Sequence, residues 1–111
     1  MTAASGIIKQ GATTTLFIDG FRDEKATPGT YLNAATATAT LYDVTVPGTR
    51  TAIGAPITLL YLAASDGRYE EVLPHDFDSG ALVDGMRIEV DYVAEEGVVH
   101  WEDTLRFRVE T

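Results

Sequence analysis

The chain has 111 residues, with 17 acidic and 8 basic side chains and a formal net charge of −9 at pH 7. This length fits one domain, residues 1–111, and the excess of negative charge opposes binding to the phosphate backbone of nucleic acids. The chain has no cysteine, which excludes disulfides and thiolate metal sites.

The N-terminal residues 1–6 have neither the basic start nor the apolar core of a secretory signal. The longest mostly apolar stretch, residues 55–64, is about half as long as a membrane-spanning helix. We therefore expect a soluble protein that is made in the cytoplasm and has no membrane partner. Residues 1–6 are interpreted as an N-terminal arm that can lie against a neighbouring molecule.

Apolar and polar residues alternate with a period of two along most of the chain, which predicts strands rather than helices. Asp66-Gly67 and Glu96-Gly97 are sequences typical of hairpin turns. About seven short strands with turns between them predict an antiparallel β-sandwich, in which helical crossovers have no room. The alternation is clearest in residues 36–42 and in the last two predicted strands, residues 86–94 and 101–109. Residues 12–18, 56–62 and 68–73 are predicted strands with a less regular pattern.

The stretch 56–62 differs from the other strands because it is apolar on both faces. This pattern indicates a strand that is buried on both sides or that faces a partner.

Residues 19–35 form a long predicted loop that contains Phe21, Arg22 and Tyr31. One interpretation is an ordinary crossover between the sheets, covered by solvated charges. The other is a docking loop, because exposed aromatic residues and arginine often contribute much of the binding energy at protein interfaces. Phe21, Arg22 and Tyr31 are therefore the candidate partner-binding residues.

Asp76, Asp78 and Asp84 are the candidate metal ligands, because closely spaced carboxylates can surround a calcium ion. The spacing does not match a complete calcium-binding loop, so the simpler interpretation is a polar loop after Pro74. A zinc site that uses His75 and His100 requires the fold to bring the two residues together. No cofactor is expected, and calcium remains the alternative.

Catalytic machinery is not evident in the sequence. The serines stand at positions 5, 65 and 79, and none has the strand–turn–helix context of an activated nucleophile. Glu70 and Glu71 are neighbours on a predicted strand and point to opposite faces, so they cannot act together on one substrate. We expect a protein that is not an enzyme.

Trp101 is interpreted as a large core residue near Tyr92. The alternative is a stacking platform for a carbohydrate, to which Tyr61 and Tyr69 would also have to contribute. The predicted core consists of Ala39, Leu41, Leu59, Tyr69, Ile88, Val90, Trp101, Leu105 and Phe107.

The alternation of apolar and polar residues in the last two predicted strands predicts how these strands pair. If Met86, Ile88 and Val90 face the core, they must lie opposite Val109, Phe107 and Leu105, because directly opposed residues share a face. This pairing sets Glu89 against Arg106. A shift of two residues would instead place Arg87 opposite Arg106, and like charges across a ladder are unfavourable.

The order of these segments resembles the small immunoglobulin-like domains encoded among the virion genes of tailed bacteriophages. The resemblance rests on Ile7-Ile8-Lys9-Gln10-Gly11, the strand ending in Leu41-Tyr42-Asp43, Pro56-Ile57-Thr58-Leu59, Asp66-Gly67-Arg68-Tyr69-Glu70, Leu73-Pro74 and Gly85-Met86-Arg87-Ile88-Glu89-Val90. It covers more than half of the chain, and its motifs are turns and core positions. Met86 stands where such domains often have a tyrosine.

The resemblance implies an immunoglobulin-like fold and a structural part of a virion: a capsid decoration or cement protein, a head–tail connector or a tail accessory. Its partners would be capsid or tail proteins of the same virion, in a homo-oligomer or symmetric array. A chain that begins at its own methionine without an export signal favours this interpretation. The alternative is an immunoglobulin-like binding module for a cell-surface protein or glycan.

Overall fold

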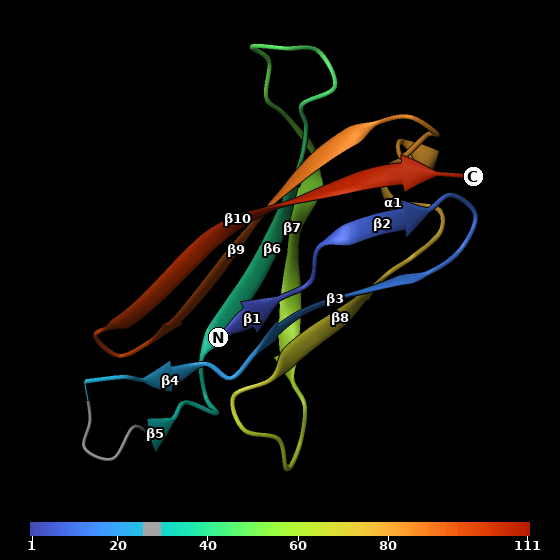
Figure 1. Cartoon of the computed structure of the whole chain (residues 1–111). Helices are drawn as coiled ribbons and strands as arrows, with labels where there is room; N and C mark the ends of the chain where they lie inside the picture. The colour runs from blue at the N-terminus through green and yellow to red at the C-terminus, as the bar shows by residue number, and fades with distance from the viewer. Residues whose placement is uncertain (26–29) are drawn as a thin grey trace.

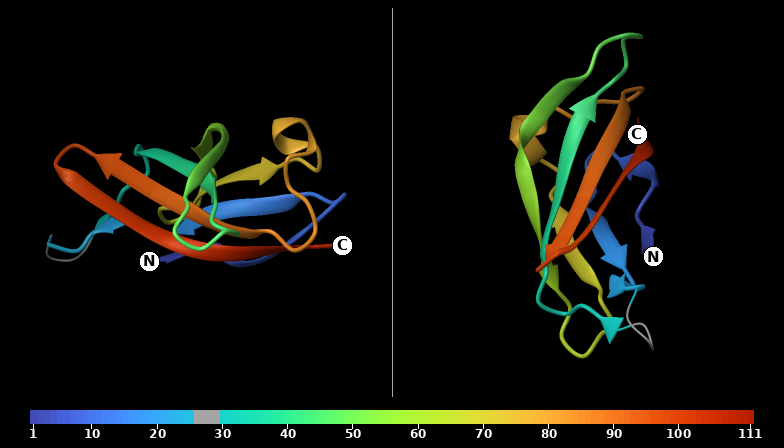
Figure 2. Two further views of the ribbon diagram at one scale, coloured as in Figure 1. Left: turned by 90° about the horizontal axis from the view of Figure 1, so that it is seen from above. Right: turned by 90° about the vertical axis from the view of Figure 1, so that its left-hand side faces the viewer.

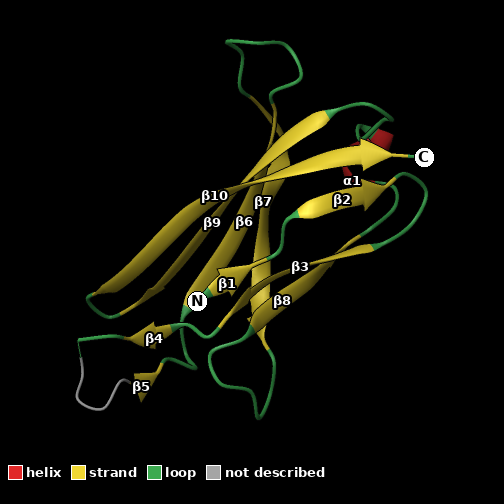
Figure 3. Cartoon of the chain, viewed as in Figure 1, coloured by secondary structure: helices red, strands yellow, loops and turns green. Residues whose placement is uncertain are grey.

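The alternating pattern folds into β-strands over most of the chain, and the expectation of an all-β protein is confirmed. The computed structural model describes residues 1–25 and 30–111 (Figure 1). Within these residues one short helical turn, α1 (Phe77–Gly80), interrupts the strands (Figure 3). The strands are β1 (Thr2–Ala3), β2 (Gly6–Lys9), β3 (Thr14–Asp19), β4 (Arg22–Asp23), β5 (Thr30–Tyr31), β6 (Thr36–Asp43), β7 (Thr51–Tyr61), β8 (Tyr69–Leu73), β9 (Arg87–Glu96) and β10 (Val99–Glu110).

Eight strands form one curled sheet in the order β1-β3-β8-β7-β6-β9-β10-β2, and β4 pairs separately with β5. Strand β7 joins the two halves of the sheet, because it pairs with β6 up to Leu59 and with β8 at Leu60 and Tyr61. The two halves fold toward each other and enclose the core between them (Figure 2). None of the helices in the described residues is long and apolar enough to cross a membrane.

The N-terminal segment differs from the expected arm, because residues 1–9 extend both edges of the curled sheet. Strand β1 pairs antiparallel with β3, and β2 then pairs parallel with β10. Ala4, between the two strands, is buried, and its carbonyl accepts a hydrogen bond from the hydroxyl of Tyr92 at 2.8 Å. The parallel pair also corrects the expectation of a wholly antiparallel sheet.

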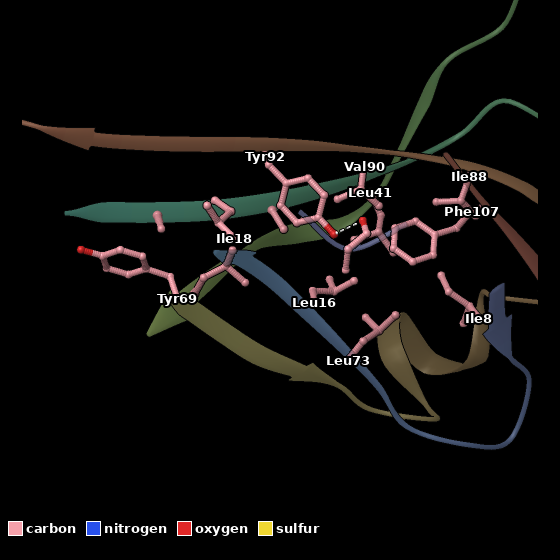
Figure 4. Close-up of a cluster of buried hydrophobic side chains, with 14 of the residues drawn as sticks. Ile8, Leu16, Ile18, Leu41, Tyr69, Leu73, Ile88, Val90, Tyr92 and Phe107 are labelled. Atoms are coloured by element: carbon pink, nitrogen blue, oxygen red, sulfur yellow. Dashed lines mark hydrogen bonds between the residues drawn. The ribbon is translucent and has the colours of Figure 1, made fainter. Parts of the chain in front are cut away.

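The predicted core is largely confirmed. Seven of its nine residues are buried, while Trp101 and Leu105 are partly buried and pack against the same cluster. The cluster also contains side chains that the sequence did not single out, and several come from the first strands (Figure 4). These additional residues include Ile8, Leu16, Ile18, Phe21 and Leu73.

The predicted register of the last hairpin is confirmed. Phe107 lies opposite Ile88, and Leu105 lies opposite Val90. The N–H of Val109 donates to the carbonyl of Met86 at 2.9 Å. Strands β9 and β10 are joined by the two residues Gly97 and Val98.

The charges across this hairpin are less favourable than the sequence argument assumed. Arg106 and Glu89 are directly opposed, with an N–O distance of 3.6 Å. The same register also places Arg87 opposite Arg108, which is a second pair of like charges directly across the ladder, of the kind that made the shifted register unfavourable. The register is kept because it buries the apolar face of both strands.

Candidate functional site

The three predicted partner-binding residues differ in their exposure to solvent. Phe21 is completely buried, its N–H donates to the carbonyl of Gly67, and its carbonyl accepts from the N–H of Leu32. The prediction that Phe21 is a docking anchor is therefore wrong. The loop after β3 folds back over the core, and Phe21 packs into the core there. Arg22 and Tyr31 are exposed and lie opposite each other in the β4–β5 pair. Residues 26–29 of the predicted loop lie outside the described residues.

The predicted calcium ligands are not assembled into a site. Asp76 and Asp78 belong to the exposed turn around α1. Asp84 lies elsewhere, where its carboxylate accepts the N–H of Thr111 at 3.0 Å and its own N–H donates to the side chain of Gln10. Within residues 1–25 and 30–111, no group of three or more histidine, aspartate or glutamate side chains is placed to hold a metal ion.

His100 contacts two carboxylates rather than a serine or the other histidine. Its Nδ1 lies 2.8 Å from Glu95 and its Nε2 lies 3.2 Å from Glu102. Hydrogen bonds to two carboxylates raise the pKa of the exposed His100 ring above its ordinary value, and the bond to Glu102 contributes more than the bond to Glu95. Ser65, one of the three serines that the sequence excluded as nucleophiles, interacts with the backbone of Arg68 and stabilises the β7–β8 turn.

The aromatic residues proposed as a sugar platform are not arranged as one. Tyr69 is buried, with its hydroxyl donating to the carbonyl of Leu32 and accepting the N–H of Ala35. Its ring is tilted by 56° from that of Tyr61. Trp101 instead lines a hollow of about 470 Å³, together with Phe21 and His100.

A groove runs across the outer side of β2, β10 and β9. It has a volume of about 610 Å³. Its lining combines apolar side chains with three guanidinium groups, and Glu89 is the acidic side chain among them. The residues that define this arginine groove are Ile7, Val44, Pro47, Arg87, Arg106 and Arg108.

The period of two explains why the arginines gather there. Ile88 and Phe107 point to the core, so Arg87, Arg106 and Arg108 on either side of them point outward. Parallel pairing then places Ile7 of β2 beside Arg108. The sequence predicted the outward arginines, but the apolar wall comes from residues about 100 and 60 positions away, so sequence periodicity could not reveal the groove.

The arginines of the groove differ in how far their charge is neutralised. Arg106 pairs with Glu89 at 3.6 Å, and Arg108 pairs with Glu110 at 2.5 Å. The guanidinium of Arg87 has no ion-pair or hydrogen-bond partner among the described residues. Three positive side chains and one negative side chain therefore line a groove in a protein whose net charge is −9.

A second surface lies on the outer side of β7 and β8. Leu60, Leu62 and Val72 are exposed by 59%, 43% and 48% and border a shallow hollow of about 270 Å³. This finding contradicts one interpretation of the apolar stretch 56–62, because the end of β7 is not buried on both sides. Exposed apolar side chains that lie together are typical of contact surfaces.

The comparisons with protein-family models, curated proteins and solved structures found no match to this chain.

Proposed function

We propose that this protein is a non-enzymatic, immunoglobulin-like structural protein of a bacteriophage virion that acts by docking onto other protein subunits. The observation that carries the docking role is the arginine groove. Arginine is enriched at protein interfaces because its planar guanidinium can bind a carboxylate through two hydrogen bonds while its stem packs on apolar groups. Ile7, Val44 and Pro47 supply those apolar groups here.

The strand order supports the immunoglobulin-like part of the proposal. Immunoglobulin-type sandwiches place their first, second, fifth and fourth strands in one sheet, and the third, sixth and seventh in the other. Here β1, β3, β8 and the end of β7 are neighbours, as are β6, β9 and β10. The short β2 then follows the last strand. This order supports the proposed immunoglobulin-like fold.

The chemistry of the groove favours one class of partner. A surface with three guanidinium groups and an apolar wall favours an acidic polypeptide segment that also carries an apolar side chain. Such contacts fit capsid decoration, head–tail connection or tail attachment, in which subunits bind one another in rings or arrays. The protein would be made in the host cytoplasm and would function in the virion.

A binding module for a cell-surface protein or glycan is the second candidate function. The hollow beside Trp101 favours it, because an indole ring next to polar groups can stack on a sugar. It receives less support than the groove, because Phe21 at its base is buried and Tyr69 faces the core.

Co-sedimentation with phage particles tests the proposal. Labelled protein should sediment with purified heads or purified tails of the phage that encodes it, and it should show no selective binding on a glycan array. Replacing two groove residues, Arg87→Ser with Arg108→Ser, should weaken particle binding by about tenfold or more. Binding to glycans but to neither heads nor tails would contradict the proposed function and support the second candidate.

A further inference from the structure

The β9–β10 hairpin is electrically polarised along its length. At one end Arg87, Arg106 and Arg108 line the arginine groove. At the other end the hairpin carries Glu95 and Glu102 on its outward face and Glu96 and Asp103 on the opposite face, and we call these four residues the acidic tip. Arg87 and Glu96 stand at the two ends of the ten-residue strand β9, about 30 Å apart at the usual rise per residue of a strand. The inner members of the two groups, Arg106 and Glu102, are closer, because they lie about four residues apart on β10.

The acidic tip also carries an apolar side chain in an unusual position. Val98, in the turn itself, is fully exposed. It is flanked by Gly97 and by the ends of two antiparallel strands, so the tip presents an apolar side chain with carboxylates behind it. Glu95 and Glu102 are exposed by 56% and 70% at their side chains.

The tip remains acidic when its neighbours are included. His100 lies between Glu95 and Glu102. The hollow beside Trp101 is also bordered by Met1 and by strand β4 with the residues after it. They add the Met1 amino group, Arg22 and Lys25 as positive charges and Asp23 and Glu24 as negative ones. The net addition is one positive charge, which is fewer than the four carboxylates of the tip.

We propose that the occupant of the arginine groove is the acidic tip of a second copy of this chain. This inference rests on the proposed docking role of the groove. Val98 would contact the apolar wall at Val44 and Pro47, while Glu95 and Glu102, which share one face of the hairpin, would approach Arg87 and Arg108. The groove and the tip have opposite charges, and each combines its charge with exposed apolar groups, so a single contact satisfies both.

The geometry makes this contact head-to-tail rather than symmetric. The groove and the tip lie at opposite ends of the hairpin, as the separation of β2 from the β9–β10 turn in Figure 1 shows. One molecule can therefore bind a neighbour at each end. A contact between different surfaces of identical subunits produces a ring when its rotation closes and a filament when it does not.

Two variants test the contact. The groove variant carries Arg87→Ser and Arg108→Ser, which removes two directly opposed like charges and should not weaken the fold. The tip variant carries Glu95→Gln, Val98→Ser and Glu102→Gln. Sedimentation velocity at low salt should show that the wild type forms larger species as concentration rises, and that each variant alone stays monomeric over the same range.

Mixing the two variants provides the decisive measurement. The groove variant retains an intact tip and the tip variant retains an intact groove, so an equimolar mixture should form dimers that cannot extend. A mixture that remains monomeric, or a wild type that is monomeric throughout, would overturn the proposal. Circular dichroism and thermal unfolding of each variant establish that it is folded.

A charge-matched control separates the groove from the net charge of the protein. Lys25→Ser removes one positive charge beside the tip, as Arg87→Ser does in the groove. Only Arg87→Ser should weaken self-association, because loss of a positive charge beside the tip makes the tip more acidic. Equal weakening by both variants would contradict a specific groove. A wild type that binds particles but does not self-associate would contradict this inference and leave the proposed function standing. A wild type that self-associates but does not bind particles would contradict the proposed function and leave this contact standing.

Discussion

The hydroxyl of Tyr92 donates a hydrogen bond of 2.8 Å to the carbonyl of Ala4, 88 residues earlier in the chain. Both residues are buried, and the bond is drawn as a dashed line in Figure 4. Burial raises the pKa of the Tyr92 phenol, so the hydroxyl stays protonated and remains a donor. This bond fixes the point where the chain crosses from the edge of one half of the sheet to the edge of the other.

Removal of the Tyr92 hydroxyl should therefore destabilise the protein. Tyr92→Phe leaves the buried carbonyl of Ala4 without its partner, at a cost of about 1–3 kcal/mol in the free energy of unfolding. Tyr61→Phe is the matched control, because its hydroxyl donates to Ser65 in a turn that water can reach. Urea denaturation should give the larger loss for Tyr92→Phe, and equal losses would contradict the role of the Tyr92 bond.

Gly67 should tolerate no side chain. Its φ is +68°, and a Cβ built there would lie 2.3 Å from the carbonyl oxygen of Phe21, which is backbone and cannot move aside. We expect Gly67→Ala to cost at least about 3 kcal/mol. Gly97→Ala, at a φ of +60° with open space around it, should cost about 1–2 kcal/mol from backbone strain alone. Urea unfolding of the two variants measures the difference, and a similar cost for both would mean that the approach to Phe21 relaxes.

Phe21 and Tyr31 should differ in what they contribute to stability. Phe21 is completely buried, whereas Tyr31 is 41% exposed. Phe21→Ala should lower the free energy of unfolding by about 3–5 kcal/mol, and Tyr31→Ala should change it by no more than about 0.5 kcal/mol. Chemical denaturation followed by fluorescence gives both values. A small loss for Phe21→Ala would restore this residue as a candidate for docking.

The titration of His100 should report the state of the acidic tip. Its pKa is raised by hydrogen bonds to Glu102 and Glu95, so an NMR titration should give a value above the ordinary value of about 6.5. Glu102→Gln should lower this pKa. Because the pKa is raised in the folded state, the stabilisation is complete below about pH 6.5 and is lost as the pH rises through the raised pKa. A pKa at or below the ordinary value would contradict the contacts.

The sequence predicted β3, β6, β7, β8, β9 and β10 and the register of the last hairpin because these depend on local patterns. It did not predict β1, β2, β4 and β5, which are too short to show an alternating pattern. Alternation assigns each residue of β9 and β10 to one face, and opposed residues must then share a face. The apolar face dominated the choice of register, since burying Ile88, Val90 and Phe107 outweighs a like-charge pair worth a few tenths of a kcal/mol. This explains why the observed register accepts Arg87 opposite Arg108.

Tertiary structure alone decided which surfaces are exposed and what they combine. Phe21 looked like an exposed aromatic residue in a polar loop, but contact with the backbone of Gly67 folds that loop over the core. The arginine groove depends on the position of Ile7 beside Arg108, which is 101 residues later in the chain. The two strands pair in parallel, so no hairpin turn in the sequence indicates that they are neighbours. Period-two patterns tell which way a side chain points, but they contain no information about the distant strand that lies next to it.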